Sequence, residues 1–169
     1  MMRLFVALEP SPEFRNALSV LQDSLRAAGV SGRYLDPSGL HLTLAFIGMW
    51  PENVAALLPH VQQPFDVTLS GIGVFPKADV LWAGVMSSGH LDDLARKVRT
   101  SLSEAGIPFD PKVFSPHITL VRKPRMAEDT ALSDIRVPPA AMIVRDVCLY
   151  RSERGENGME YTVIGRSRR

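Results

Sequence analysis

The chain has 169 residues, 46% of them apolar and 22% charged, which is ordinary for a soluble globular protein and argues against disorder. This length can bury one good core, or two small lobes packed together. A formal net charge of +1 is too small to bind duplex nucleic acid through an extended electrostatic surface. Any nucleic-acid contact should therefore be short and local, with an end or a small fragment.

Cysteine usage and hydropathy indicate the compartment. Cys148 is the single cysteine and has no partner for an intramolecular disulfide, which fits a reducing environment. The N-terminal apolar run is too short for a signal-peptide core, and no later run approaches membrane-spanning length. We therefore expect a soluble cytoplasmic protein with no membrane contact.

The first part of the chain is predicted to open with a strand over residues 3–8. A helix follows, because Ser11 suits the N-cap, Pro12 suits the first helical position, and apolar residues keep helical spacing as far as Gly29. Further elements are expected in this order: a strand at 33–35, a turn at 36–39, a strand at 40–47, a helix at 51–58, and an antiparallel pair of strands at 65–74 and 80–86.

The second part is predicted to begin with a helix over 91–105, ended by Gly106 and Pro108. The elements expected after it are a strand at 116–122, a loop over 123–139 with a short helix near 127–132, and two strands at 141–152 and 159–164 joined by a turn at 153–158. The expected basic tail, taken as solvated, contains Arg166, Arg168 and Arg169.

One tetrapeptide pattern occurs twice. His41-Leu42-Thr43-Leu44 is followed 76 residues later by His117-Ile118-Thr119-Leu120, and chance would place such a pattern at two of the four histidines roughly once in 3000. Since successive side chains of a strand point to opposite faces, His and Thr share one face and the apolar residues enter the core. A lone His is more often a structural one bonded to backbone. We expect a structural role for His90 in the capping turn of the helix over 91–105, and His60 receives no role.

The order of elements predicts the fold class. Strand, helix and strands are followed by helix and strands, and no linker or low-complexity tract divides them. We expect an α+β protein in which residues 1–169 form a single domain of two pseudo-symmetric lobes, each an antiparallel sheet with helices on its outer face. A cleft between the lobes would then collect His41, Thr43, His117 and Thr119.

Such a cleft suits acid and base chemistry on a phosphodiester. Two imidazoles can accept and donate protons near neutral pH, two threonine hydroxyls can bind phosphoryl oxygens, and Arg122 could add a charge-assisted contact. Neither motif supplies a ligand cluster for a metal, and neither a nucleophile elbow nor a phosphate-binding glycine loop is present, so no metal or nucleotide cofactor is expected.

The paired motifs resemble those of the 2H phosphoesterase superfamily, and specifically its RNA 2',3'-cyclic phosphodiesterases, historically called 2'-5' RNA ligases. The similarity extends over nearly the whole chain, and the segments that carry it are 3–8, 40–48, 80–85 and 114–122. One departure is Tyr34, where the family usually has Trp.

This resemblance implies a bilobal fold and hydrolysis of RNA 2',3'-cyclic phosphate ends to 2'-phosphates without metal or nucleotide. It also implies that His41 donates the proton to the leaving 3'-oxygen, that His117 activates water, and that Thr43 and Thr119 hold the phosphate. Expected partners are RNA ends or small cyclic-phosphate nucleotides, with no obligate protein partner and a monomeric state. Alternatives are a small cyclic nucleotide or ADP-ribose cyclic phosphate as substrate, 2'-5' RNA ligation or cleavage, and a non-catalytic RNA-end binding module.

Overall fold

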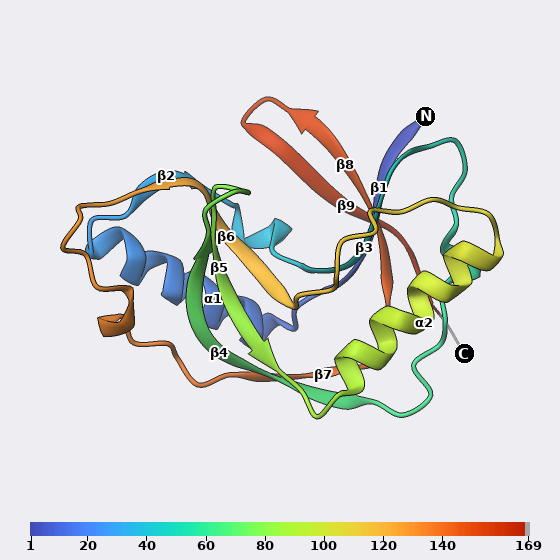
Figure 1. Ribbon diagram of the computed structural model, residues 1–169, viewed down its shortest axis with the longest axis horizontal. Coiled ribbons are helices and arrows are strands. Elements are labelled where there is room, and N and C mark those ends of the chain that lie inside the picture. The colour runs from blue at the N-terminus through green and yellow to red at the C-terminus, as the bar shows by residue number, and fades with distance from the viewer. Residues whose placement is uncertain (168–169) are drawn as a thin grey trace.

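Two antiparallel sheets and two long helices make up the computed structural model, which describes residues 1–167 (Figure 1). Sheet A has the strand order β3 (Leu42–Trp50), β1 (Met2–Leu8), β8 (Cys148–Gly155) and β9 (Gly158–Arg166). Sheet B has the order β2 (Ser31–Tyr34), β6 (His117–Arg125), β5 (Val80–Met86), β4 (Phe65–Phe75) and β7 (Ala141–Val144). The predicted α+β class with two antiparallel sheets is confirmed.

The first helix, α1 (Pro12–Ala27), forms as its sequence signals predict. The Ser11 hydroxyl accepts a hydrogen bond from the Phe14 amide at 3.3 Å, and Pro12 occupies the first helical position, where its missing N–H costs nothing. The buried stripe of α1 contains Gln22, whose amide donates to the carbonyls of Leu35 at 2.9 Å and Leu120 at 3.1 Å. Because Leu120 belongs to β6, these bonds fasten α1 to sheet B.

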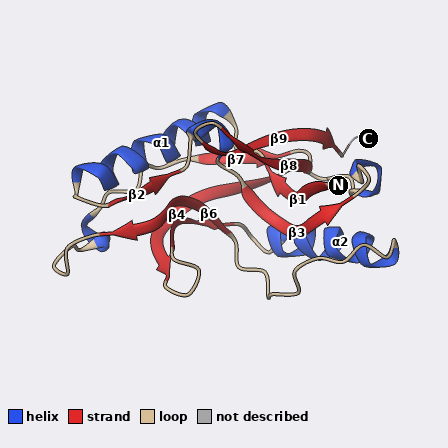
Figure 2. Cartoon of the chain, turned by 90° about the horizontal axis from the view of Figure 1, so that it is seen from above, coloured by secondary structure: helices blue, strands red, loops and turns tan. Residues whose placement is uncertain are grey.

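The two helices are exchanged between the sheets. Helix α1 follows β1 of sheet A but contacts β6 and β7 of sheet B, whereas α2 (His90–Glu104) follows β5 of sheet B but contacts β3 of sheet A. Figure 2 shows α1 and α2 on opposite sides of the strands. One cluster of buried side chains includes residues of both sheets and both helices, so the two lobes share their core.

Two predicted elements differ from the structure in the first and middle parts of the chain. The predicted helix over 51–58 is wrong, since β3 continues to Trp50 and only the short 3-10 helix η2 (Ala55–Leu57) follows, without a side-chain cap. A segment this short buries Val54 and Leu58 without needing a full helix. The predicted turn at 36–39 contains another 3-10 helix, η1 (Pro37–Gly39).

The C-terminal part also departs from expectation. The strand predicted over 141–152 is two strands, because the chain leaves sheet B after Val144 and enters sheet A at Cys148. The short helix expected near 127–132 is instead the 3-10 helix η3 (Leu132–Asp134). Strands β8 and β9 extend to Gly155 and from Gly158, so the predicted turn shrinks to Glu156 and Asn157.

Arg166 is exposed as expected but does not lie in a tail, because it ends β9. Its guanidinium donates to the Glu9 carboxylate at 2.7 Å and to Cys148 Sγ at 3.2 Å, and it lies 3.7 Å from the Asp146 carboxylate. Burial raises the pKa of the Cys148 thiol to about 12. Arg168 and Arg169 lie outside the described residues. Neither described helix has the length and hydropathy of a membrane-spanning segment.

We propose that residues 1–169 are a single domain and expect both sheets to unfold in one transition, because their core and helices are shared. Trp50 lies in sheet A and Trp82 in sheet B, so the variants Trp50→Phe and Trp82→Phe each leave one sheet with a fluorescent reporter. In urea, the fluorescence midpoint of each variant should coincide with its own far-UV circular dichroism midpoint. Two separated midpoints in either variant would contradict a single domain.

Candidate functional site

The two histidine motifs meet where the sheets adjoin. His41 immediately precedes β3, and His117 is the first residue of β6; β3 and β6 belong to different sheets and contact one another. Along both strands the residues predicted to face the core are buried, and His41, Thr43, His117 and Thr119 are half-buried. We call the half-buried side of β3 and β6 that carries these four residues the motif face.

Both motifs contain a β-bulge at the same place. In sheet A, Val6 pairs with Ala45 and Ala7 pairs with Thr43, so Leu44 is skipped in the ladder. An extra residue on one strand of an antiparallel pair interrupts the alternation of side chains. Leu44 and Ala45 are therefore buried in succession.

The equivalent bulge in sheet B brings Arg122 to the motif face. Leu81 pairs with Val121 and Trp82 pairs with Thr119, which leaves Leu120 unpaired. Without the bulge, Arg122 would share the core-facing side of Leu120. With it, Arg122 points to the same side as Thr119, and its guanidinium donates to Tyr161 Oη at 3.2 Å. The sequence analysis nominated Arg122 without detecting the bulge that orients it.

A helix supports each bulge through the carbonyl of the skipped leucine. The Leu120 carbonyl accepts from the Gln22 amide of α1, and the Leu44 carbonyl accepts from Arg99 Nε of α2 at 3.2 Å. The Leu120 carbonyl also accepts from the Leu35 amide at 3.0 Å, so the Gln22 amide is its second donor. Each helix thereby stabilises the irregular strand of the sheet onto which it packs.

The tautomer of each histidine is set by the carbonyl two residues earlier. His41 Nδ1 lies 2.7 Å from the Gly39 oxygen, and His117 Nδ1 lies 2.7 Å from the Ser115 oxygen. Because a carbonyl can only accept, Nδ1 carries the hydrogen in both rings. In the neutral form of each ring, Nε2 is then the nitrogen left to exchange a proton.

The loop before His41 is held by two side chains. Asp36 accepts from the Ser38 amide at 2.9 Å and so caps η1, and Arg15 of α1 donates to the Pro37 carbonyl. These bonds fix the turn that ends in Gly39, and hence the acceptor for the His41 ring. Arg15 was not recognised from the sequence, because its partner is a backbone atom 22 residues away.

The surroundings of the two histidines differ. His41 is enclosed by aromatic rings, with centroid distances of 4.6 Å to Phe5, 5.1 Å to Tyr161 and 5.5 Å to Tyr150. His117 makes one such contact, edge to face with Phe75 at 5.0 Å. The enclosing residues come from β1, β8 and β9, and the sequence analysis missed their role because nothing local links them to His41.

Burial lowers the pKa of His41 to about 4. The hydrogen bond with Gly39 acts in the opposite direction, while the positive charges of Arg122, His117 and Arg15 lower the pKa further. In the free protein His41 is therefore uncharged at neutral pH.

Gly73 and Tyr34 have structural roles in the packing of the protein. Gly73 leaves room for the Trp82 indole, which would collide with any Cβ there. Tyr34 lies under Arg26 of α1, 4.1 Å from ring centroid to guanidinium carbon, and its hydroxyl donates to the Val30 carbonyl at 2.7 Å. Tyr34 is thus engaged with α1 and its following turn.

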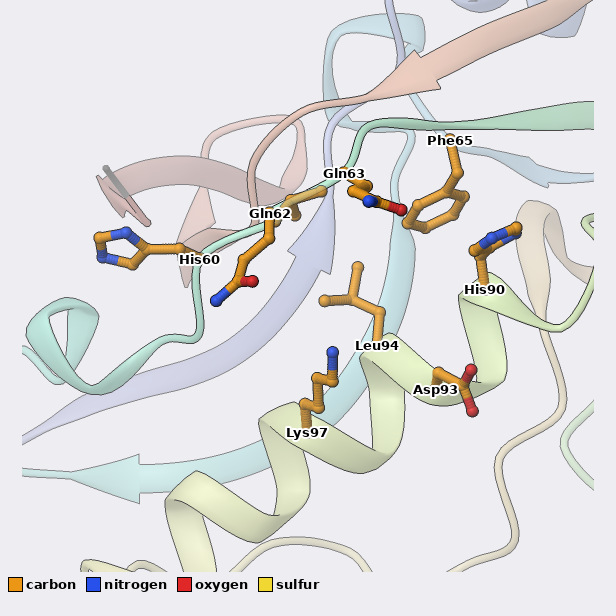
Figure 3. Close-up of a pocket in the computed structure, with 9 residues that line it drawn as sticks. His60, Gln62, Gln63, Phe65, His90, Asp93, Leu94 and Lys97 are labelled. Carbon is orange, nitrogen blue, oxygen red and sulfur yellow. The ribbon is translucent and has the colours of Figure 1, made fainter.

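A separate cavity of about 260 Å³ lies between α2 and the segment 60–65 (Figure 3). His60 and His90 line it, and none of the five predicted site residues does. The His90 ring stacks on Phe65 at 5.3 Å, and His90 is the first residue of α2. Among residues 1–167 no group of three or more His, Cys, Asp or Glu side chains could hold a metal ion.

Comparison with known proteins identifies the family. A model of the 2'-5' RNA ligase superfamily matches residues 8–156. A protein of Methanothermobacter thermautotrophicus named RNA 2',3'-cyclic phosphodiesterase is 30% identical over 178 aligned positions, which cover 95% of each chain. A protein of the same name from Escherichia coli is 29% identical, and the match covers 97% of this chain and 94% of the relative.

Solved structures agree. TT0787 of Thermus thermophilus is 34% identical with a TM-score of 0.76, and the match covers 98% of this chain and 97% of that one. Escherichia coli LigT complexed with 3'-AMP is 26% identical with a TM-score of 0.78 and coverage of 98% and 96%. The resemblance inferred from the paired motifs is confirmed, and the chain belongs to the 2'-5' RNA ligase superfamily of 2H phosphoesterases.

Proposed function

We propose that the protein hydrolyses 2',3'-cyclic phosphate ends of RNA to 2'-phosphates, with His41 and His117 as the acid and base. The observation that carries this proposal is the matched pair of imidazoles, each with Nδ1 bound by a carbonyl and Nε2 available. The names of the relatives support the substrate class, and LigT has been crystallised with 3'-AMP and with phosphate.

In the proposed reaction, a water oxygen attacks phosphorus and the bond from phosphorus to the 3'-oxygen breaks. His117 Nε2 takes the proton of the water, and His41 Nε2 gives a proton to the departing 3'-oxygen, an assignment that follows the family resemblance. Thr43 and Thr119 hydroxyls and the Arg122 guanidinium hold the non-bridging oxygens, where negative charge develops. No atom of the reaction requires a metal ion or a nucleotide.

The low pKa of His41 in the free protein is compatible with this assignment. A phosphodiester anion beside Arg122 would offset the positive charges that disfavour the imidazolium, and so raise the pKa of His41 when substrate binds. The proton needed for the leaving oxygen would then be taken up together with the anion. We further propose a cytoplasmic monomer without an obligate protein partner.

The direct test uses an oligoribonucleotide with a 2',3'-cyclic phosphate end. We expect conversion to a 2'-phosphate end in the presence of EDTA and without ATP, because the proposed chemistry needs only protein side chains. Nuclear magnetic resonance of phosphorus identifies the product isomer. Activity that disappears on chelation and returns with one metal would contradict the acid-base mechanism.

Related substrates separate the alternatives. Faster turnover of a mononucleotide cyclic phosphate or ADP-ribose cyclic phosphate than of the oligonucleotide would favour the small-molecule function. Joining or cleavage of 2'-5' linked RNA in the same assay would favour the ligase function. Binding of the cyclic end without turnover would favour a recognition module.

Removing either histidine should nearly abolish turnover. We expect His41→Ala and His117→Ala each to lower kcat by roughly a hundred- to ten-thousandfold, the usual contribution of a general acid or base. Steady-state kinetics on the cyclic oligonucleotide measures the loss. His60→Ala and His90→Ala are the matched controls and should retain nearly full activity, since both residues line the separate cavity.

A substrate with a more acidic leaving group decides between the two roles. It needs no donated proton, so it should restore much of the activity of His41→Ala and leave His117→Ala impaired. Restoration of His117→Ala alone would exchange the roles. Wild-type activity in both alanine variants would remove the histidines from the mechanism.

The pKa of His41 should also be visible in protein stability. The unfolded chain binds a proton at His41 near pH 6.5, whereas the folded protein resists it until about pH 4. Above pH 6.5, His41 is neutral in both states and the free energy of unfolding has its full value. As the pH falls toward 4, the unfolded chain gains a proton at His41 that the folded protein does not, and the free energy of unfolding decreases by about 3 kcal/mol. Urea denaturation of wild type and His41→Gln between pH 7 and 4 measures the difference.

The Gln variant keeps a neutral side chain throughout this range and should lack this part of the pH dependence. If the free energies of unfolding of the two proteins changed in parallel with pH, the pKa of His41 would be unaltered by folding. Inorganic phosphate at saturating concentration should move the inflection of the wild type to higher pH, because a bound anion favours the imidazolium.

A further inference from the structure

Tyr161 connects the two sheets at the motif face. It lies in β9 of sheet A, and its hydroxyl oxygen accepts a hydrogen bond from the Arg122 guanidinium, which comes from β6 of sheet B, at 3.2 Å. Figure 1 shows the hairpin of β8 and β9 standing opposite β6. The bond therefore joins residues of different lobes.

The Tyr161 ring is fixed by the same residues that fix His41. It meets the His41 ring at 5.1 Å and the Phe5 ring edge to face at 5.7 Å. It also lies against Gly39, where an added Cβ would come within 3.0 Å of the ring. Since the Gly39 carbonyl sets the His41 tautomer, the position of Tyr161 is tied to that of the imidazole.

Arg122 depends on an external contact for its orientation. Arginine has many rotamers, and the residue after Arg122, Lys123, adopts a φ of 51°, so the strand is irregular there. Among residues 1–167 the Tyr161 hydroxyl is the side-chain group to which Arg122 donates, and no carboxylate forms an ion pair with it. The remaining guanidinium donors are available to a ligand.

The neutrality of the tyrosine hydroxyl matters for this arrangement. A carboxylate in the same place would orient the guanidinium but cancel its charge, and would repel an anionic substrate. A hydroxyl orients through its lone pair and leaves the charge intact. The site thus keeps a full positive charge at a defined position beside His41.

We propose that Tyr161 is a positioning residue, which acts through Arg122 by holding its guanidinium beside His41 for the phosphate of the substrate. The inference rests on the proposed function of the motif face and assigns it a further residue. The ring and the hydroxyl have separate tasks: the ring packs against His41, and the hydroxyl orients Arg122.

A double-mutant cycle tests the role of the hydroxyl. Tyr161→Phe keeps the ring and removes one hydrogen bond to a charged group, and should lower kcat/KM for the cyclic oligonucleotide by roughly ten- to a hundredfold. In the Arg122→Ala background the same change should cost less than about twofold, because its target is gone. Equal losses in the two backgrounds would overturn the proposal, as would an unaffected Tyr161→Phe variant.

The matched control is Tyr34→Phe. It removes a hydroxyl that also makes one hydrogen bond and whose ring also lies near an arginine, Arg26, but on α1. It should leave kcat/KM within about twofold of wild type. Thermal unfolding of every variant, followed by circular dichroism, establishes that the assay compares folded proteins.

A binding cycle distinguishes this proposal from the proposed function. The affinity for inorganic phosphate, measured by calorimetry on the same four proteins, should fall roughly tenfold for Tyr161→Phe and change little in the Arg122→Ala background. If wild type turns over no cyclic phosphate but the binding cycle is non-additive, the proposed function fails and the role of Tyr161 stands. If phosphate binding is additive, or absent in wild type, the role of Tyr161 is overturned.

Discussion

The β-bulge that follows the threonine of each motif is the constraint on which the site depends. It turns two successive residues into the core and restores the following side chain to the motif face. Gln22 of α1 and Arg99 of α2 each donate to the carbonyl of the skipped leucine. Because each helix follows a strand of the other sheet, the bonds that support the bulges also fasten the two lobes together.

The sequence alone predicted the sheets, both long helices and the shared face of His and Thr, because alternation and helical spacing are local signals. It predicted the antiparallel pairing of β4 with β5 but could not reveal which strands distant in the chain pair, and several differences follow from that. The strand over 141–152 is divided because its halves enter different sheets, and Arg122 faces the site only because Leu120 is skipped against β5. The rings around His41 come from three strands far apart in the chain, so no local pattern could group them.

The two histidines share one backbone arrangement but differ in environment. Aromatic burial and neighbouring positive charge keep His41 neutral in the free protein, while His117 has one ring beside it. Two histidines that carry out opposite proton transfers need different pKa values, since two identical imidazoles would compete for the same proton. Tyr161 contributes to the difference in environment in two ways: its ring packs against His41, and its hydroxyl accepts a hydrogen bond from Arg122.

The exchange of helices between the two sheets bears on how the two histidines can have different environments. In the segments β1-α1-β2-β3 and β5-α2-β6, the helix packs onto the sheet other than that of the strand before it, as in two subunits of a swapped dimer. In a true homodimer every substitution is copied to both subunits, and the two histidines would remain equivalent. When both segments lie on one polypeptide, each can change independently, so that His41 is enclosed by aromatic rings while His117 has only one ring beside it.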